Sequence, residues 1–141
     1  MATDENERGA MIQYRKLRGY KYQLMDPYVI QTKVCPDDAV VHDFFELSEA
    51  GELLIKKGYC WDGPSGPTID TPDFMRGSLV HDVFYQMIRE QLIPGWCRKY
   101  ADALLKEICI EDGMSRARAW YVYWSVRKFA AFAAKPKEQE E

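Results

Sequence analysis

Residues 59–70, with the sequence YCWDGPSGPTID, place the strongest limit on the fold of this chain. Two glycines and two prolines within this stretch disfavour any regular element and predict a loop. The β-favouring residues before the loop occur in short runs separated by turn formers. We therefore expect a strand over residues 28–34 and a β-hairpin over residues 44–59, with its turn at residues 48–51.

The residues directly after the loop predict the start of a helix. Thr71 is a suitable N-cap, Pro72 favours the first helical position, and Asp73 complements the positive end of the helix dipole. We expect this helix to cover residues 72–92, because a Pro-Gly pair follows at residues 94–95.

Two further helices are expected in the remainder of the chain. The first covers residues 96–112 and ends before Gly113, a residue type that commonly follows a helix C-terminus. The second covers residues 115–134, with Ser115 as its N-cap. This order predicts an α+β fold, in which N-terminal antiparallel β-hairpins or a sheet precede three α-helices packed together.

The length of 141 residues and the hydrophobic content of 47% are sufficient for one core of ordinary size. We expect a single α+β domain over residues 11–134, with its β part at about 11–60 and the loop at 61–70. Flexible charged tails are expected at residues 1–10 and 135–141. The tails carry the acidic excess behind the net charge of −3, so the rest of the chain is neutral and has no strong nucleic-acid signature.

The sequence also suggests where the chain is found. No apolar run reaches the length of a transmembrane segment, and the N-terminal stretch MATDENERG is acidic, unlike a signal peptide. We therefore expect a cytosolic protein. The four cysteines lack C-x-x-C spacing, so we expect reduced thiols and no zinc site.

Only two histidines are available for acid–base chemistry near neutral pH. His81 and Tyr85 lie four residues apart in the first predicted helix and therefore share a face. Asp82 points about a quarter-turn away, so the adjacent pair can divide the handling of a proton and a cation. The alternative is a buried, hydrogen-bonded His81 that only supports the core. His42 and Asp43 point to opposite faces of a predicted strand, and we interpret His42 as an ordinary surface residue.

Three segments carry a family resemblance. They are WDGPSGPTIDTPDFMRGSLVHDVFY at residues 61–85, ADALLKEI at residues 101–108 and RAWYVYWSVR at residues 118–127. Together they resemble an uncharacterised phage and prophage family, the domain of unknown function 1353, over most of the chain from about residue 58 to residue 127. The resemblance implies a phage or prophage gene, and the family carries no established activity.

A more distant resemblance concerns mechanism. The sequence His81-Asp82-Val83-Phe84-Tyr85, after a glycine-rich loop and before a helix that bears Asp102, is similar to the catalytic core of phospholipase A2. The resemblance implies that His81 is the general base for water and that Tyr85 and Asp102 orient it. Histidine titrates near neutral pH, and a carboxylate on its far nitrogen fixes the tautomer.

Asp102 also has a structural alternative. Arg98 and Lys106 lie four residues on either side of it, which is typical of a solvated ladder of charges along a helix.

The same resemblance implies a calcium site. Asp82 would be the carboxylate ligand, with carbonyl oxygens of the loop at Gly63 and Gly66, and Asp62 is a further candidate ligand. Ser65 and Trp61 are candidate binding residues of the same loop. The alternative is a rigid connection in which the glycines supply positive φ angles and the prolines limit the entropy of the unfolded chain.

The third predicted helix lies in a stretch, residues 114–135, that contains five cations and no acid. Arg116 and Arg127 lie three turns apart on nearly the same side and are candidates to bind lipid headgroups, a nucleic-acid backbone or an acidic protein. The alternative is a solvated charged edge. We expect most aromatic residues of this helix to pack in the core; they are Trp120, Tyr121, Tyr123, Trp124, Phe129 and Phe132.

The leading functional hypothesis is a phage-associated, phospholipase A2-like hydrolase, or a degenerate relative, that acts on a phospholipid or other ester with calcium as a candidate cofactor. The alternative is a non-enzymatic virion or tail-associated protein with a buried His-Tyr-Asp network, whose partners are other phage structural proteins. These hypotheses place the chain in the cytoplasm of a bacterial host or in the virion. A third hypothesis, an intracellular accessory protein that blocks a host defence, has no sequence feature of its own.

Overall fold

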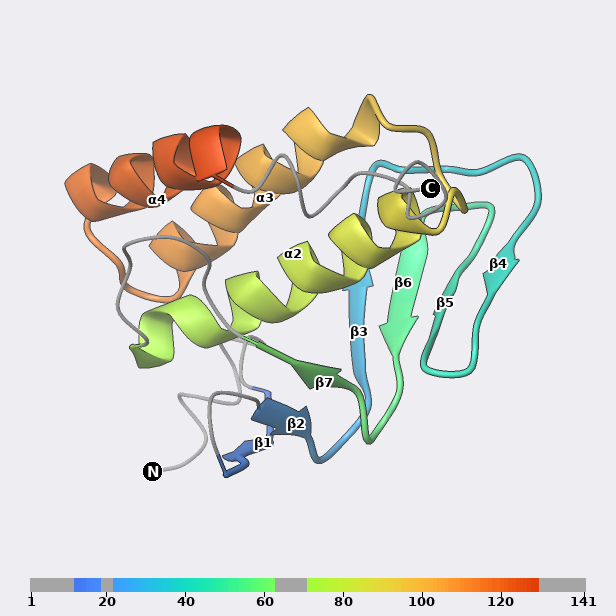
Figure 1. Ribbon diagram of the computed structural model, residues 1–141, viewed down its shortest axis with the longest axis horizontal. Coiled ribbons are helices and arrows are strands. Elements are labelled where there is room, and N and C mark those ends of the chain that lie inside the picture. Colours follow the sequence, from blue (N-terminus) through green and yellow to red (C-terminus); the bar gives the residue numbers. More distant parts are fainter. Residues whose placement is uncertain (1–11, 19–21, 63–70, 130–141) are drawn as a thin grey trace, which may run out of the picture. The chain divides into compact units, whose positions relative to one another are not determined.

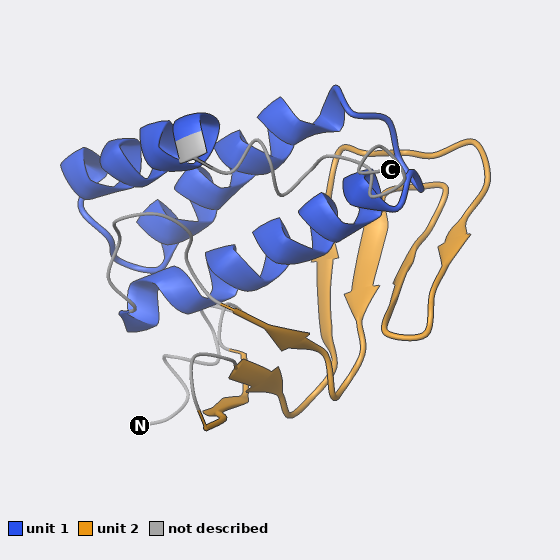
Figure 2. Cartoon of the chain, viewed as in Figure 1, with its two compact units in different colours: residues 1–11, 63–141 blue, residues 12–62 orange. Residues whose placement is uncertain are grey.

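The computed structural model describes residues 12–18, 22–62 and 71–129 of the chain. It has the predicted α+β fold, with antiparallel strands in the N-terminal half and three helices in the C-terminal half (Figure 1). The chain divides into a strand unit, residues 12–62, and a helical unit formed by the remainder (Figure 2). The predicted tails at residues 1–10 and 135–141 lie outside the described residues.

The strand unit contains two antiparallel sheets. One has the strand order β1-β2-β7, and the other has the order β3-β6-β5-β4. The strands are β1 (Tyr14–Lys16), β2 (Tyr22–Leu24), β3 (Tyr28–Gln31), β4 (Val40–Val41), β5 (Phe45–Leu47), β6 (Glu52–Ile55) and β7 (Cys60–Trp61).

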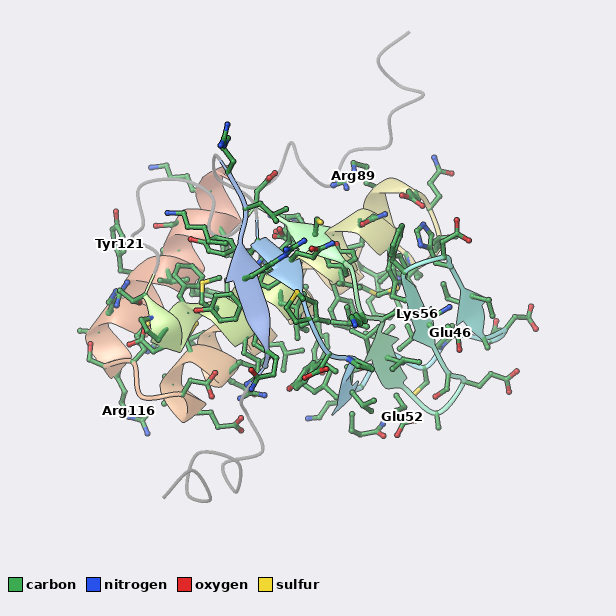
Figure 3. The ribbon with its side chains drawn as sticks, turned by 90° about the horizontal axis from the view of Figure 1, so that it is seen from below. Glu46, Glu52, Lys56, Arg89, Arg116 and Tyr121 are labelled. Atoms are coloured by element: carbon green, nitrogen blue, oxygen red, sulfur yellow. The ribbon has the colours of Figure 1, made fainter. Side chains whose placement is uncertain are left out.

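The predicted hairpin is formed by β5 and β6, with Phe45 paired to Ile55 and Leu47 to Leu53. These four side chains are fully buried. Gly51 ends the turn with a φ of +90°, and a Cβ atom there would lie 2.5 Å from the carbonyl oxygen of residue 32, so only glycine fits. On the outer side of the same hairpin, Lys56 pairs with Glu46 at 3.2 Å (Figure 3).

The helical unit contains α2 (Pro72–Arg89), α3 (Cys97–Glu111) and α4 (Arg116–Phe129). The first helix is shorter than predicted, because the chain turns at Gln91, whose φ is +62°. Gly113 follows α3 with a φ of +106°, which confirms it as the C-terminal glycine. Within the described residues, none of the helices has the length and apolar character needed to cross a bilayer.

Two predicted helix caps behave differently in the structure. The Ser115 hydroxyl oxygen accepts a hydrogen bond from the backbone N–H of Arg118 at 3.2 Å, which confirms Ser115 as a cap of α4. Thr71 occupies the N-cap position of α2, but the capping prediction was wrong for its side chain. The Thr71 hydroxyl donates to the carboxylate of Asp73 instead, and this bond takes it away from the backbone N–H groups.

Helix α3 packs against both α2 and α4. The approach of α2 is closest at Gly77, where a Cβ atom would lie 2.9 Å from Leu105 Cδ1 and 3.1 Å from Cys109 Sγ. One residue earlier, the buried Arg76 forms ion pairs with Glu111 and Asp112 at the end of α3. The absence of a side chain at Gly77 and the ion pairs of Arg76 therefore hold the start of α2 close to the end of α3.

We expect Gly77→Val to lower the free energy of unfolding by about 1–3 kcal/mol, because the added atoms must push α2 away from α3. Urea unfolding of the full chain measures the loss. Gly95→Val is the matched control, since no atom lies within 4 Å of a Cβ placed there. Equal stability of the two variants would contradict the close approach.

Candidate functional site

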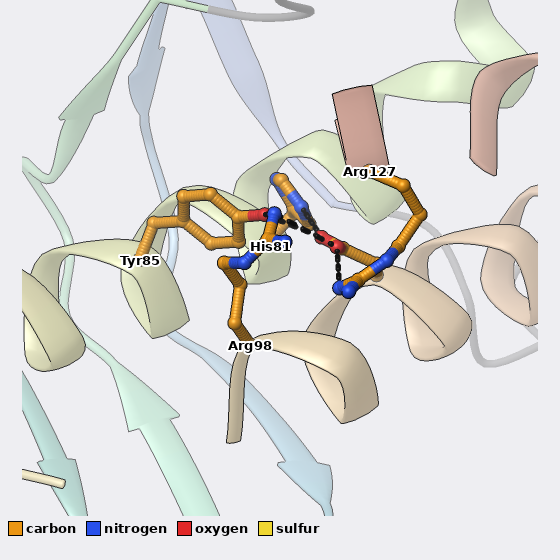
Figure 4. Close-up of polar contacts among 5 residues, drawn as sticks. His81, Tyr85, Arg98 and Arg127 are labelled. Carbon is orange, nitrogen blue, oxygen red and sulfur yellow. Dashed lines mark hydrogen bonds and ion pairs between the residues drawn. The ribbon is translucent and has the colours of Figure 1, made fainter. Parts of the chain in front are cut away.

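The helical unit brings together the three residues that the sequence proposed as catalytic. His81 and Tyr85 project from successive turns of α2 (Figure 4). Asp102 of α3 is hydrogen-bonded to both of them. All three are buried: the exposed fraction is 6% for His81, 3% for Tyr85 and 0% for Asp102. Residues about twenty positions apart in the sequence therefore form one buried polar cluster.

The cluster has the hydrogen bonds of a histidine oriented by a carboxylate. Nε2 of His81 lies 2.6 Å from Oδ1 of Asp102, and the Tyr85 hydroxyl donates to the same oxygen at 2.6 Å. A carboxylate accepts hydrogen bonds, so this geometry assigns the imidazole proton to Nε2 and leaves the lone pair on Nδ1. No residue in the described part of the helical unit hydrogen-bonds to Nδ1.

Two arginines complete the coordination of Asp102. Arg127 of α4 donates to Oδ2 at 2.7 Å, and Nη1 of Arg98 lies 3.6 Å from the same oxygen. Arg98 also donates to the Tyr85 hydroxyl at 3.3 Å. Asp102 thus receives hydrogen bonds from α2 and α4, and the two guanidinium groups leave the cluster with a positive surplus of charge.

The alternative that the sequence offered for Asp102, a solvated ladder of charges, was wrong. Asp102 is fully buried, so it belongs to no solvated ladder with Arg98 and Lys106. The Nζ atom of Lys106 lies instead 3.7 Å from the centre of the Trp120 ring. The role of Arg127 at the cluster was missed, because a residue on a later helix gives no local signal of a partner on α3.

The surroundings set the ionisation of both acidic partners. Burial alone would raise the pKa of Asp102, but hydrogen bonds from His81, Tyr85 and Arg127 outweigh it and lower that pKa. Burial and the bond to Asp102 raise the pKa of Tyr85 far above its ordinary value. Near neutral pH, Asp102 is therefore an anion that accepts, and Tyr85 is a neutral phenol that donates.

The calcium site stays a prediction, because part of its predicted ligand set lies outside the described residues. Asp82 lies on α2 and is half-buried, while Asp62 belongs to the strand unit and is exposed. The loop residues Gly63, Ser65 and Gly66 lie outside the described residues. Within the described ranges, no group of three or more histidine, cysteine or acidic side chains could hold a metal, and the cysteines are free thiols.

The structure also describes three other residues that the sequence singled out, two in the strand unit and one on α4. Trp61 is a buried residue of β7, where its ring lies 5.8 Å from that of Tyr22. Arg116 is exposed at the start of α4. His42 stacks on Phe45 at 4.2 Å and accepts a hydrogen bond from the backbone N–H of Phe44, which is a local structural role.

The predicted packing of the α4 aromatics was largely wrong. Trp120, Tyr121 and Trp124 are exposed, because small or β-branched residues occupy the buried face of the helix. Phe132 and the side chain of Phe129 lie outside the described residues. The residues on the buried face are Ala119, Val122, Ser125 and Val126.

Comparison of the chain with protein-family models, with curated proteins and with solved structures finds no match in any of the three.

Asp102 should make an acid-sensitive contribution to stability. Its pKa is lower in the folded than in the unfolded chain, so the contribution is full above the unfolded pKa of about 3.9 and is lost as pH falls through the folded pKa. We expect Asp102→Asn to cost about 3 kcal/mol of unfolding free energy at pH 7, because it breaks buried charge pairs.

Urea unfolding of the wild type and of Asp102→Asn over a range of pH measures this contribution. The difference between the two proteins should shrink below about pH 4. Asp43→Asn, at an exposed position, should show no such difference. A gap that stays constant down to about pH 2 would contradict the assignment of a buried, ionised Asp102.

Proposed function

We propose that the chain is an ester hydrolase in which His81 activates a water molecule. The orientation of His81 carries this proposal. Nε2 is held by the buried carboxylate of Asp102 at 2.6 Å, while Nδ1 has no partner in the described part of the helical unit. A histidine arranged in this way can take a proton on one nitrogen while the carboxylate on the other stabilises the imidazolium that forms.

The proposed reaction uses this arrangement of His81 and Asp102. Nδ1 removes a proton from water as the water oxygen attacks the ester carbonyl, and the resulting imidazolium returns the proton to the leaving alcohol. One water and one ester give one acid and one alcohol, with no covalent intermediate on the protein. Asp102 holds the ring in place throughout, and Tyr85 and Arg127 hold Asp102 through hydrogen bonds to its two oxygens.

The substrate class is part of the proposal. A phospholipid fits the resemblance of the His81 helix to phospholipase A2, and the positive surplus from Arg98 and Arg127 suits a substrate with an anionic group. We include calcium only as a variable in the assay. Among the described residues, the predicted ligand Asp82 is not part of a cluster of three or more side chains that could hold a metal. A phage or prophage origin, with a location in the bacterial cytoplasm or the virion, rests on sequence resemblance alone.

His81→Gln tests the general base while it spares the network. The side-chain amide of glutamine can still donate to Asp102, but it cannot accept a proton near neutral pH. We expect fatty-acid release from phospholipid vesicles, assayed with calcium and with a chelator, to fall at least about a thousandfold in this variant. The thermal unfolding midpoint should change by only a few degrees.

His42→Gln is the matched control, since it changes the other histidine, which lies in the strand unit. It should keep full activity. If the wild type releases no acid from phospholipids or from simpler carboxylic esters, with or without calcium, the hydrolase proposal is wrong. Equal activity of His81→Gln and the wild type would remove His81 from the mechanism.

One observation favours a second candidate, a non-enzymatic phage structural or binding protein. His81 and Asp102 are almost completely buried, and among the described residues every side-chain nitrogen and oxygen that is fully cut off from solvent has a hydrogen-bond partner, so Nδ1 of His81, which has none, is not fully cut off from solvent. Such a network stabilises a fold without any chemistry.

For that candidate, we expect no esterase activity in the wild type and a loss of about 1–3 kcal/mol of unfolding free energy in His81→Ala, because the alanine removes a donor from Asp102. His81→Gln should then retain most of the stability, which urea unfolding measures. Measurable ester hydrolysis that depends on His81 would exclude a purely structural role.

A further inference from the structure

Helix α4 presents aromatic side chains to solvent on the face opposite its buried residues. The exposed fraction is 44% for Trp120, 50% for Tyr121 and 62% for Trp124. Large aromatic side chains are normally placed in a core, so a set of three on one exposed helix face indicates an interaction surface. Figure 3 labels Tyr121 and Arg116 of this helix, which lie near the outer edge of the helical unit in that view.

The exposed residues form a regular pattern along the helix. Arg116, Trp120, Trp124 and Lys128 follow one another at intervals of four residues, so they lie on successive turns of one face. We call these four residues the α4 stripe. It has a cation at each end and two indole rings between them, and it is about 18 Å long at 1.5 Å per residue.

Contacts with neighbouring side chains hold the indole rings in place. The Trp120 ring packs edge-on against Tyr123 at 5.6 Å, and the Trp124 ring packs edge-on against the same tyrosine at 5.4 Å. Lys106 of α3 adds a further cation over Trp120. The sequence of α4 contains four cations and no acidic residue; Arg118 pairs with Asp73 and Arg127 with Asp102, so Arg116 and Lys128 carry the positive charge of the stripe.

The observations favour an anionic bilayer over other partners. An aromatic side chain has roughly 150–250 Å² of surface in all, so the three half-exposed rings offer only about 300 Å² of aromatic surface, against roughly 800 Å² per partner in a standard protein interface. A nucleic-acid surface needs many cations in contact with phosphates, whereas two of the four cations of α4 are paired with Asp73 and Asp102. At a bilayer surface, tryptophan rings lie at the depth of the lipid headgroups, and cationic side chains bind the lipid phosphates. The two indole rings and the two flanking cations of the stripe suit such a surface.

We propose that the α4 stripe binds the surface of bilayers that contain anionic phospholipids. The indole rings of Trp120 and Trp124 insert at headgroup depth, and Arg116 and Lys128 contact lipid phosphates. Arg127 lies beside the stripe but is held by Asp102, so it is not counted among the lipid contacts. The surface is independent of ester hydrolysis, and His81→Gln should bind vesicles as tightly as the wild type.

Sedimentation of the full chain with vesicles tests the proposal. One set contains phosphatidylcholine only, and the other also contains phosphatidylglycerol. We expect binding to be at least about tenfold tighter to the anionic set at low salt, and to weaken as salt is added. The double variants Trp120→Ala/Trp124→Ala and Arg116→Ala/Lys128→Ala should each lose about tenfold or more in affinity for the anionic set.

Two controls change the same residue types at other exposed positions of the helical unit. Trp96 has an exposed fraction of 76% and directly precedes α3, and Lys99 is exposed on α3. Trp96→Ala and Lys99→Ala should bind as the wild type does. The thermal unfolding midpoint should change by only a few degrees in every one of these variants, since the side chains removed are at least partly exposed.

Several results would overturn the proposal. They are an absence of binding to anionic vesicles at low salt, unchanged binding of the double tryptophan variant, and an equal loss in the Trp96→Ala control. Binding of single-stranded DNA or polyglutamate without binding of vesicles would instead assign the stripe to a nucleic acid or to an acidic protein. Self-association that the double tryptophan variant abolishes, without vesicle binding, would assign it to a second copy of the chain.

Discussion

The buried carboxylate of Asp102 is the interaction on which the helical unit depends. It lies on α3, receives hydrogen bonds from His81 and Tyr85 of α2, and receives another from Arg127 of α4. An ionised carboxylate without water is stable only when both of its oxygens are bonded to donors or cations. The three helices therefore have to keep their spacing for this one group to stay charged, and the same spacing is what orients His81.

The order of elements and the main turns could be predicted from the sequence, because they depend on local residue types. Gly51, Gly113 and Ser115 occupy the positions that turn and cap chemistry assigns to them. The length of α2 could not be predicted in this way, since Gln91 adopts a positive φ that its residue type does not favour. The bonding of the Thr71 side chain could not be predicted either, because its hydroxyl can bond to a backbone N–H of the first helical turn or to the carboxylate of Asp73.

The proposed catalytic residues were found through helical spacing and resemblance, but their electrostatic environment was not. Arg98 was visible as a neighbour of Asp102 at four residues, yet spacing alone does not distinguish a solvated pair from a buried one. For α4, hydrophobicity was a poor guide to burial. Closely packed helices accept small and β-branched residues such as Ala119 and Val122 at their contact, which turns the tryptophans outward.

Gly77 has a consequence that reaches beyond the packing of two helices. It lies four residues before His81, so the approach that it permits also sets how far Nε2 must reach to Asp102. A hydrogen bond of this kind weakens when its length changes by a few tenths of an ångström. The distance between His81 and Asp102 thus depends on a residue that has no side chain, and a larger residue there can disturb their hydrogen bond while every polar residue of the cluster stays intact.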